Sequence, residues 1–277
     1  MASAIHGFAL VTPASRGIGF AFAQQLLAQT HLPVVATARN ECDEVRQKLL
    51  SGEGLPPDSE GRLDVLKVDV KDEPSISSMA DTIRKKYPNT PLRLALTIPG
   101  VLHVEKSPSQ IDAATALDSF QVNAIGPLLL MKHLYQFLPN KSAPPFPPSD
   151  LSLSRGKIGL NLPSHAIYAL MAARVGSVSD NASGGWYSYR ASKASVYQIA
   201  KTFDLYLRGR CAERALAVAM HPGTVHTEFT KEFWKGREML EPLDAADLLL
   251  RFLAQLPPSF ESGRGKCWDW QGKEVIP

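Results

Sequence analysis

Tyr189 and Lys193 are the residues of this 277-residue chain whose types and spacing best suit chemistry. They lie four positions apart in a segment where the apolar residues Val196, Ile199 and Phe203 recur at helical spacing, which places both side chains on one helix face. The ordinary pKa of a phenol is about 10, and a neighbouring ammonium favours the phenolate, so the pair predicts a lowered tyrosine pKa. Such a phenol can exchange a proton with a carbonyl or alcohol oxygen. The alternative is a surface pair, because this spacing is also common by chance.

A second candidate site is a glycine-containing turn near the amino terminus. It follows the apolar run 8–11 and opens a segment with helical spacing. N–H groups at a helix start, together with the positive end of the helix dipole, bind pyrophosphate. In a strand–turn–helix unit the pattern predicts a dinucleotide site. The residues expected to contact the dinucleotide are Thr12, Ser15, Arg16, Gly17, Ile18 and Gly19. The alternative is a glycine pair that only caps the helix.

Two arginines bear on the choice of dinucleotide. Arg39 follows the second apolar run, 33–38, where an acidic residue suits NAD and an arginine suits the 2′-phosphate of NADP. Arg16 reaches the same region, and two guanidiniums favour NADP, as NADPH, over NAD. The alternative is two solvated surface arginines. Asp69, expected to end the third strand, is a candidate to bind the adenine amino group or, alternatively, to cap the next helix.

Apolar runs of strand length alternate with helical segments along the chain. Strands are expected at residues 8–11, 33–38, 66–70, 92–98, 166–171 and 215–220, and a long helix at 113–138. This alternation predicts an α/β fold, a Rossmann-like doubly wound parallel sheet flanked by helices. We expect a single domain over residues 1–277. The proline-rich segment 141–157 is interpreted as a surface insertion, because a domain boundary there would split the sheet.

Composition excludes several classes of protein. The chain is 44% hydrophobic and 21% charged, as is typical of soluble globular proteins, and no apolar run approaches the roughly 18 residues of a membrane span. The formal charge of +3 is spread without a basic stripe, so nucleic acid is not an expected partner. Cys42, Cys211 and Cys267 are isolated, which fits neither disulfides nor a metal site, and no signal-peptide pattern is present. We therefore expect a cytoplasmic protein.

Taken together, these motifs resemble the short-chain dehydrogenase/reductase family. The turn after the first strand, Asp69, Asn123, the Tyr189–Lys193 pair and the segment 222–227 occur in the family's order and spacing over nearly the whole chain. Residues 173–181 and 184–193 resemble the C-factor or sniffer-like carbonyl reductase branch. The resemblance implies an NADP(H)-dependent oxidoreductase that acts on a small carbonyl or alcohol substrate. It also implies a homodimer or homotetramer that pairs through the helices carrying Asn123 and Lys193.

The resemblance implies a role for each matching residue. Tyr189 is expected to be the general acid/base, Lys193 to lower its pKa and hold the nicotinamide ribose, and Asn123 to anchor a proton-relay water. The residues expected to line the nicotinamide amide are Pro222, Gly223, Val225 and Thr227. Gly100, in the loop expected near the adenine ribose, is a further expected cofactor contact. Two alternatives stay open: Asn123 bonds backbone inside its own helix, and Thr227 caps the following helix.

The chain departs from the family pattern at three places. Pro13 replaces a glycine of the turn, and residues 97–100, Thr-Ile-Pro-Gly, replace Asn-Asn-Ala-Gly. The substrate-orienting serine falls on Ala172 or Ala173, neither of which donates a hydrogen bond, and Ser177 is the nearest hydroxyl at plausible spacing. These departures favour a second hypothesis, a cofactor-binding protein with little or no turnover. The intact Tyr189–Lys193 pair argues against it.

A substrate lid is expected over residues 228–245, where Phe229 and Phe233 provide apolar side chains. The alternative is an ordinary amphipathic helix. Trp268 and Trp270 either border the same pocket or belong to the core, and the core is the favoured interpretation.

Overall fold

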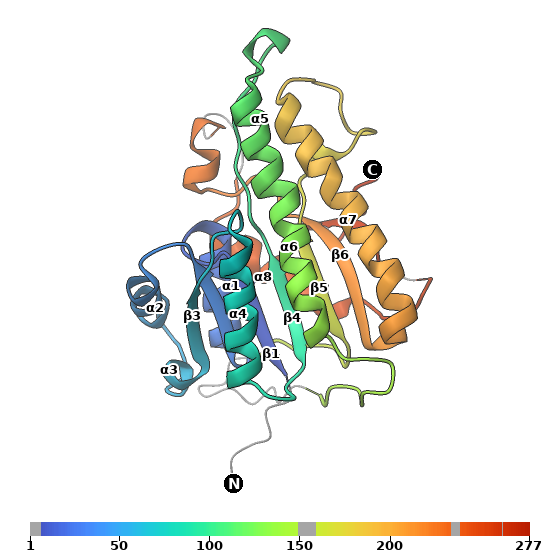
Figure 1. Ribbon diagram of the computed structural model, residues 1–277. Coiled ribbons are helices and arrows are strands. Elements are labelled where there is room, and N and C mark those ends of the chain that lie inside the picture. Colours follow the sequence, from blue (N-terminus) through green and yellow to red (C-terminus); the bar gives the residue numbers. More distant parts are fainter. Residues whose placement is uncertain (1–6, 149–158, 234–238, 262) are drawn as a thin grey trace.

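A computed structural model of the protein describes residues 7–148, 159–233, 239–261 and 263–277. In these residues, one parallel sheet of seven strands forms the centre of the fold (Figure 1). The strand order is β3-β2-β1-β4-β5-β6-β7. The strands are β1 (Phe8–Thr12), β2 (Val34–Ala38), β3 (Leu63–Lys67), β4 (Leu92–Thr97), β5 (Ala166–Met171), β6 (Ala215–His221) and β7 (Cys267–Asp269). All positions of β1, β2, β4 and β5 are buried, as expected for a parallel sheet covered on both faces. The predicted fold class is confirmed.

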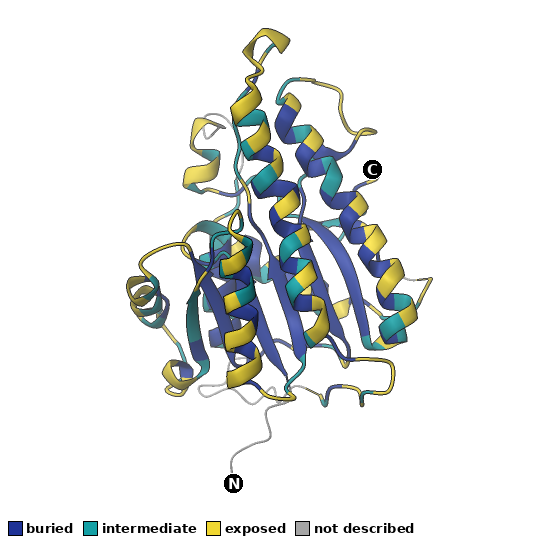
Figure 2. Cartoon of the chain, in the orientation of Figure 1, coloured by how far each residue is buried: buried dark blue, intermediate teal, exposed yellow. Residues whose placement is uncertain are grey.

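Helices cover both faces of the sheet (Figure 2). Their bounds are α1 (Gly17–Gln29), α2 (Cys42–Leu50), α3 (Ser59–Arg62), α4 (Glu73–Lys86), α5 (Ala113–Phe120), α6 (Gly126–Leu134), α7 (Tyr187–Cys211) and α8 (Pro242–Gln255). Buried residues of α1 and α8 belong to one hydrophobic cluster with the sheet, and those of α4, α6 and α7 belong to another. These two clusters form the core. None of the described helices is long and apolar enough to cross a membrane.

The predicted strands agree with the structure except at two places. The third strand, predicted at 66–70, is three residues too late, because β3 ends at Lys67. The alternation of apolar and charged residues was misleading here, because Val68 is buried although the strand has already ended. The N–H of Val68 donates to the carbonyl of Ala38. Asp69 consequently follows β3 by two residues instead of ending it. β7 was not predicted, because three residues carry too little periodicity.

The predicted long helix at 113–138 is interrupted. A π-helical turn, Gln121–Ile125, joins α5 to α6, and a 3₁₀ turn, Tyr135–Phe137, ends the segment. Pro127 explains the interruption, because proline cannot donate the α-helical hydrogen bond to the carbonyl four residues earlier, that of Asn123. Single π turns inside α-helices are frequent at functional sites, and Asn123 lies in this one.

The proline-rich segment 141–157 is described only up to residue 148, and residues 149–157 lie outside the described residues. Within the described part, Phe146 is buried and its N–H donates to the carbonyl of Ser164. The Arg93 guanidinium lies 5.0 Å from the centroid of the Phe146 ring. This end of the segment is therefore attached to the core.

Candidate active site

The sheet has a topological switch point between β1 and β4, from which the strand order runs outward in both directions. Ligands of doubly wound sheets bind at the carboxyl ends of the strands beside such a point. The turn 12–19 follows β1 there, and Gly100 follows β4. The ammonium of Lys193 reaches the same edge, donating to the carbonyls of Met171 (2.8 Å) and Pro99 (3.4 Å). The structure thus brings the two predicted halves of the site to one edge.

The turn after β1 favours glycine at one position and requires it at another. Gly17 has φ +58°, in the left-handed region. A Cβ on Gly19 would lie 2.1 Å from the Pro13 carbonyl oxygen. No side chain of the described residues caps the start of α1, which leaves its first N–H groups without a side-chain acceptor and suits an anionic ligand. This arrangement fits the pyrophosphate of a dinucleotide.

Thr12, which was expected to contact the cofactor, is fully buried. Its hydroxyl accepts from the hydroxyl of Thr37 at 2.6 Å and so joins β1 to β2. Ser15 and Arg16 are exposed at the start of α1, and Arg39 is exposed after β2. Neither guanidinium has a hydrogen bond or ion pair among the described residues. Both are therefore available to a phosphate. The carboxylate of Asp69 accepts the N–H of Lys71 at 3.0 Å, a local turn contact.

Tyr189 and Lys193 lie in the first turns of α7 and are both buried, with exposed fractions of 6% and 2%. Burial lowers the pKa of Lys193 to about 8. Burial raises the pKa of Tyr189, so the predicted lowering is wrong for this conformation. The reason is geometric: Lys193 directs its ammonium to the main-chain carbonyls of Met171 and Pro99. A raised pKa keeps the phenol protonated, which is the form that donates a proton.

Asn123 connects the loop after β4 to α7. Its amide accepts from the N–H of Val101 (2.8 Å) and donates to the carbonyl of Val101 (2.9 Å) and to the hydroxyl of Ser192 (3.0 Å). The alternative that it bonds backbone in its own helix is therefore wrong. A Cβ on Gly100 would lie 3.7 Å from the Lys193 ammonium and 3.9 Å from the Asn123 side-chain oxygen. Gly100, Asn123 and Lys193 thus meet around one point.

The structure does not support Ser177 as the substitute for the missing serine. Its hydroxyl donates to the carbonyl of Ile276 and accepts the N–H of Asp180. Its hydroxyl proton is therefore used in a hydrogen bond to the carboxyl-terminal segment and is not free to orient a substrate. Sequence spacing could not reveal this contact, because the two residues are 99 positions apart. Ala172 is buried, and neither it nor Ala173 has a side-chain donor.

The segment 222–227 meets the turn after β1. The Thr227 methyl group lies 3.5 Å from where a Cβ on Gly17 would stand. Gly223 has φ +78°, and a Cβ there would lie 2.7 Å from the indole of Trp270. Val225 is buried, and Pro222 is half-buried. Trp268 and Trp270 both pack against the core, as predicted. Trp270 in addition contacts this segment, and Trp268 contacts Phe252.

Aromatic rings flank Tyr189 on two sides. The ring centroids of Trp186 and Phe229 lie 6.2 Å and 6.1 Å from that of Tyr189. Phe229 belongs to a 3₁₀ segment, Glu228–Phe233, in the expected lid, and residues 242–245 of that lid instead begin α8. Residues 234–238 lie outside the described residues. Trp186 and Ser192 were missed from the sequence, although both lie within three residues of Tyr189 on or beside its helix.

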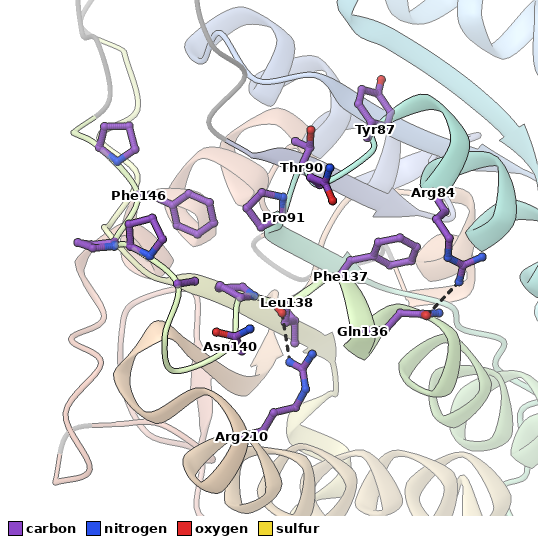
Figure 3. A pocket seen from close by; sticks show the side chains of 16 residues that line it. Arg84, Tyr87, Thr90, Pro91, Gln136, Phe137, Leu138, Asn140, Phe146 and Arg210 are labelled. Atoms are coloured by element: carbon purple, nitrogen blue, oxygen red, sulfur yellow. Dashed lines mark hydrogen bonds between the residues drawn. The ribbon is translucent and has the colours of Figure 1, made fainter.

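A cavity of about 610 Å³ opens at the opposite, amino-terminal edge of the sheet (Figure 3). Tyr87, Phe137 and Phe146 contribute to its wall. Its two arginines have protein partners: Arg84 donates to Gln136, and Arg210 donates to the carbonyl of Leu138. The candidate chemistry lies at the other edge, so this cavity is separate from the site around Tyr189.

Comparison with known proteins agrees with the fold and with the family resemblance. The short chain dehydrogenase family matches residues 7–143. A 1-hydroxy-2-glutathionyl-2-methyl-3-butene dehydrogenase of Rhodococcus sp. strain AD45 is 27% identical over 209 residues, 73% of this chain and 78% of that protein. The C-signal protein of Myxococcus xanthus is 28% identical over 166 residues, 60% of this chain and 80% of that protein. The chain belongs to the short-chain dehydrogenase/reductase family, a family of oxidoreductases.

Solved structures show the same fold. The carbonyl reductase Sniffer of D. melanogaster superimposes with a TM-score of 0.79 at 19% identity, covering 98% of this chain and 99% of that one. An NADPH-bound carbonyl reductase from chicken fatty liver gives a TM-score of 0.77 at 24% identity, covering 98% of each chain. The similarity to the C-factor and sniffer-like branch is thus present in both sequence and fold.

Proposed function

We propose that this protein reduces a carbonyl compound, or oxidises the corresponding alcohol, by NADP(H)-dependent hydride transfer. The observation that carries the proposal is the placement of Tyr189 and Lys193. Both are buried in α7 at the carboxyl edge of the sheet, beside the switch point and the turn that fits a pyrophosphate. A binding scaffold has no need of a buried phenol and ammonium at that place.

The residues divide the work of reduction between them. NADPH, when bound, supplies a hydride to the carbonyl carbon and leaves as NADP⁺. Tyr189 donates its phenolic proton to the carbonyl oxygen, which gives the alcohol and leaves a tyrosinate. The ammonium of Lys193 would hold the ribose hydroxyls of the bound cofactor, and its positive charge would make the tyrosinate that forms less unfavourable than burial alone makes it. Asn123 holds the loop after β4 against α7 and is proposed to anchor the water that reprotonates Tyr189.

The preference for NADP over NAD rests on Arg16 and Arg39. Both are exposed, and no described residue competes for them. The 2′-phosphate of NADP accepts bidentate hydrogen bonds from guanidinium groups. The NADPH-bound carbonyl reductase from chicken fatty liver, which has the same fold, supports this choice.

The decisive experiment follows NADPH oxidation by its near-ultraviolet absorbance against a panel of aldehydes, ketones and quinones, with Tyr189→Phe as the paired variant. We expect turnover by the wild type and a loss of about 100-fold or more in Tyr189→Phe, because a positioned general acid contributes that much. Saturable NADPH binding without turnover of any substrate would reject the reductase function.

A second candidate function is cofactor binding with little or no turnover. Two observations favour it: the hydroxyl of Ser177 is committed to Ile276, and residues 172 and 173 are alanines. Loss of an oxyanion donor commonly costs about 100-fold or more in rate. The same assay separates the two functions, because a binding protein gives equal, near-zero rates for the wild type and Tyr189→Phe.

We also propose a homodimer or homotetramer formed through α5, α6 and α7. Figure 2 shows exposed positions along all three helices. Exposed apolar residues lie on these helices and on the turns Gln121–Ile125 and Tyr135–Phe137 that follow α5 and α6. They are Leu117, Ile125, Leu128, Tyr135, Leu205 and Tyr206, referred to below as the α5–α7 apolar face. Apolar groups that remain exposed together on a folded chain are typical of protein interfaces.

A further inference from the structure

A buried carboxylate holds the first turn of the helix that carries Tyr189. Glu105, in the loop after β4, is 2% exposed. One of its carboxylate oxygens accepts the N–H of Ser188 at 2.7 Å, and the other accepts the Ser188 hydroxyl at 2.6 Å. Its main-chain carbonyl accepts the N–H of Trp186 at 2.6 Å. Three hydrogen bonds thus join one residue to the start of α7.

The charge of Glu105 has no cation within ion-pair distance among the described residues. A buried carboxylate is costly unless its charge is compensated and its oxygens are hydrogen-bonded. Here the compensation comes from α7, a helix of 25 residues whose positive dipole end points at the carboxylate. The N–H of Ser188, the second residue of α7, is one of the groups that a helix leaves without an internal partner. Glu105 therefore caps α7 from a distant segment.

The chain that enters α7 needs such an external restraint. Gly184, Gly185 and Trp186 adopt φ values of +62°, +66° and +52°. Left-handed backbone is unfavourable for tryptophan and persists only where the surroundings impose it. Tyr189 directly follows Ser188, so a shift of this turn moves the phenol. The start of the Glu105 loop is itself fixed by Asn123 through Val101.

We propose that Glu105 is a positioning residue for Tyr189. Its hydrogen bonds to Ser188 fix the first turn of α7, so that the phenol lies at a set distance from the ammonium of Lys193 and from the reacting carbonyl. The loop 100–105, which Asn123 holds at its start, thereby fixes the position of Tyr189 through its end at Glu105. This role rests on the proposed reductase function, because it concerns the geometry of that reaction.

The test compares Glu105→Ala, Glu105→Gln and Ser188→Ala with the wild type. The side-chain amide introduced by Glu105→Gln can accept the Ser188 N–H and donate to the Ser188 hydroxyl, so this variant keeps both contacts without the charge. Asp112→Ala is the matched control, because Asp112 caps α5 through the N–H of Thr115 at 3.0 Å. The assay measures kcat, the KM for the carbonyl substrate and the NADPH dissociation constant, at a temperature well below every melting point.

Positioning predicts a selective loss of kcat. For Glu105→Ala we expect kcat to fall about 10- to 100-fold, with KM and the NADPH dissociation constant changed less than about threefold. Glu105→Gln restores kcat to within about threefold of the wild type, and Ser188→Ala gives a smaller loss than Glu105→Ala. Asp112→Ala lowers the melting temperature and leaves kcat unchanged.

Several results would overturn the role. A purely structural cap lowers the melting temperature of Glu105→Ala and leaves kcat of the folded protein intact. A kcat in Glu105→Gln as low as in Glu105→Ala would show that the charge, and not the pair of contacts, matters. If Glu105→Ala does not fold, an unchanged kcat in Ser188→Ala rejects positioning. No turnover by the wild type rejects the reductase function and this role with it, which distinguishes that failure from the others.

Discussion

The ammonium of Lys193 donates to the carbonyl of Met171, at the end of β5, over 2.8 Å. Burial lowers the pKa of Lys193 to about 8, below its ordinary value of 10.5. The Lys193 amine therefore binds its proton more weakly in the folded protein than in the unfolded chain. The cost of burying the charge is fully present below pH 8 and is relieved as the pH rises from 8 toward 10.5. Between about pH 7 and about pH 10, the unfolding free energy of the wild type should therefore rise by about 2 kcal/mol relative to that of Lys193→Met.

This pH dependence is measured as the difference in unfolding free energy between Lys193→Met and the wild type, from urea titrations at a series of pH values. The difference cancels the titration of all other groups. A difference that stays constant across this pH range would contradict the lowered pKa.

Arg39 and Arg16 should govern cofactor choice. We expect Arg39→Ala to raise the KM for NADPH about tenfold and to leave the KM for NADH unchanged, since only NADPH carries the 2′-phosphate. Thermal stabilisation by the two cofactors gives an independent measurement. Arg84→Ala, at the opposite edge of the sheet, is the control. Equal stabilisation by NADPH and NADH, unaltered in Arg39→Ala and Arg16→Ala, would disprove the charge argument.

Gly19 should tolerate no side chain. A Cβ at this position would lie 2.1 Å from the carbonyl oxygen of Pro13 and 2.8 Å from the Ile98 side chain. Gly19→Ala must therefore displace the turn, and we expect at least a tenfold weaker NADPH affinity together with a lower melting temperature, roughly the effect of overpacking by one methyl group. Gly61→Ala is the matched control, because a Cβ there has nothing within 4 Å. Unchanged NADPH affinity in Gly19→Ala would reject this turn as the pyrophosphate site.

Phe229 should contribute to substrate binding. Phe229 is 42% exposed and its ring centroid lies 6.1 Å from that of Tyr189, so an apolar substrate at the phenol would cover it. We expect Phe229→Ala to raise the KM for a bulky aromatic ketone about tenfold, in line with the loss of one apolar contact surface, and to change the KM for a small aldehyde less. Leu248→Ala, an exposed apolar residue of α8, serves as the control. Equal KM changes for both substrates would place Phe229 outside the substrate site.

The α5–α7 apolar face should mediate self-association. Leu128→Glu places a charge on the α6 part of this face, and burying an unpaired carboxylate at an interface is unfavourable. We expect light scattering to show a dimer or tetramer for the wild type and a monomer for Leu128→Glu. Leu243→Glu makes the same change on α8, where Leu243 is 47% exposed, and should leave the oligomer intact. A monomeric wild type, or dissociation by both variants, would contradict the proposed interface.

Local patterns were sufficient for much of this protein. Apolar runs predicted six of the seven strands found in the described residues, because buried parallel strands are continuously apolar. Four-residue spacing placed Tyr189 and Lys193 on one helix face, since helical periodicity is a property of the chain itself. Gly17 and Gly19 were identified by their position between a strand and a helix, where the backbone must turn tightly.

Contacts between distant segments were decided only by the tertiary structure. Spacing suggested that Lys193 would act on Tyr189, but folding placed the carbonyls of Met171 and Pro99 within reach of the ammonium, and burial then raised the phenol pKa. Ser177 was chosen by its distance along the chain, yet it bonds a residue 99 positions away. Glu105 showed no pattern at all, because a cap supplied from another loop has no periodicity. The sequence determined which groups exist and on which element each lies; the packing of those elements determined their hydrogen-bond partners and their protonation.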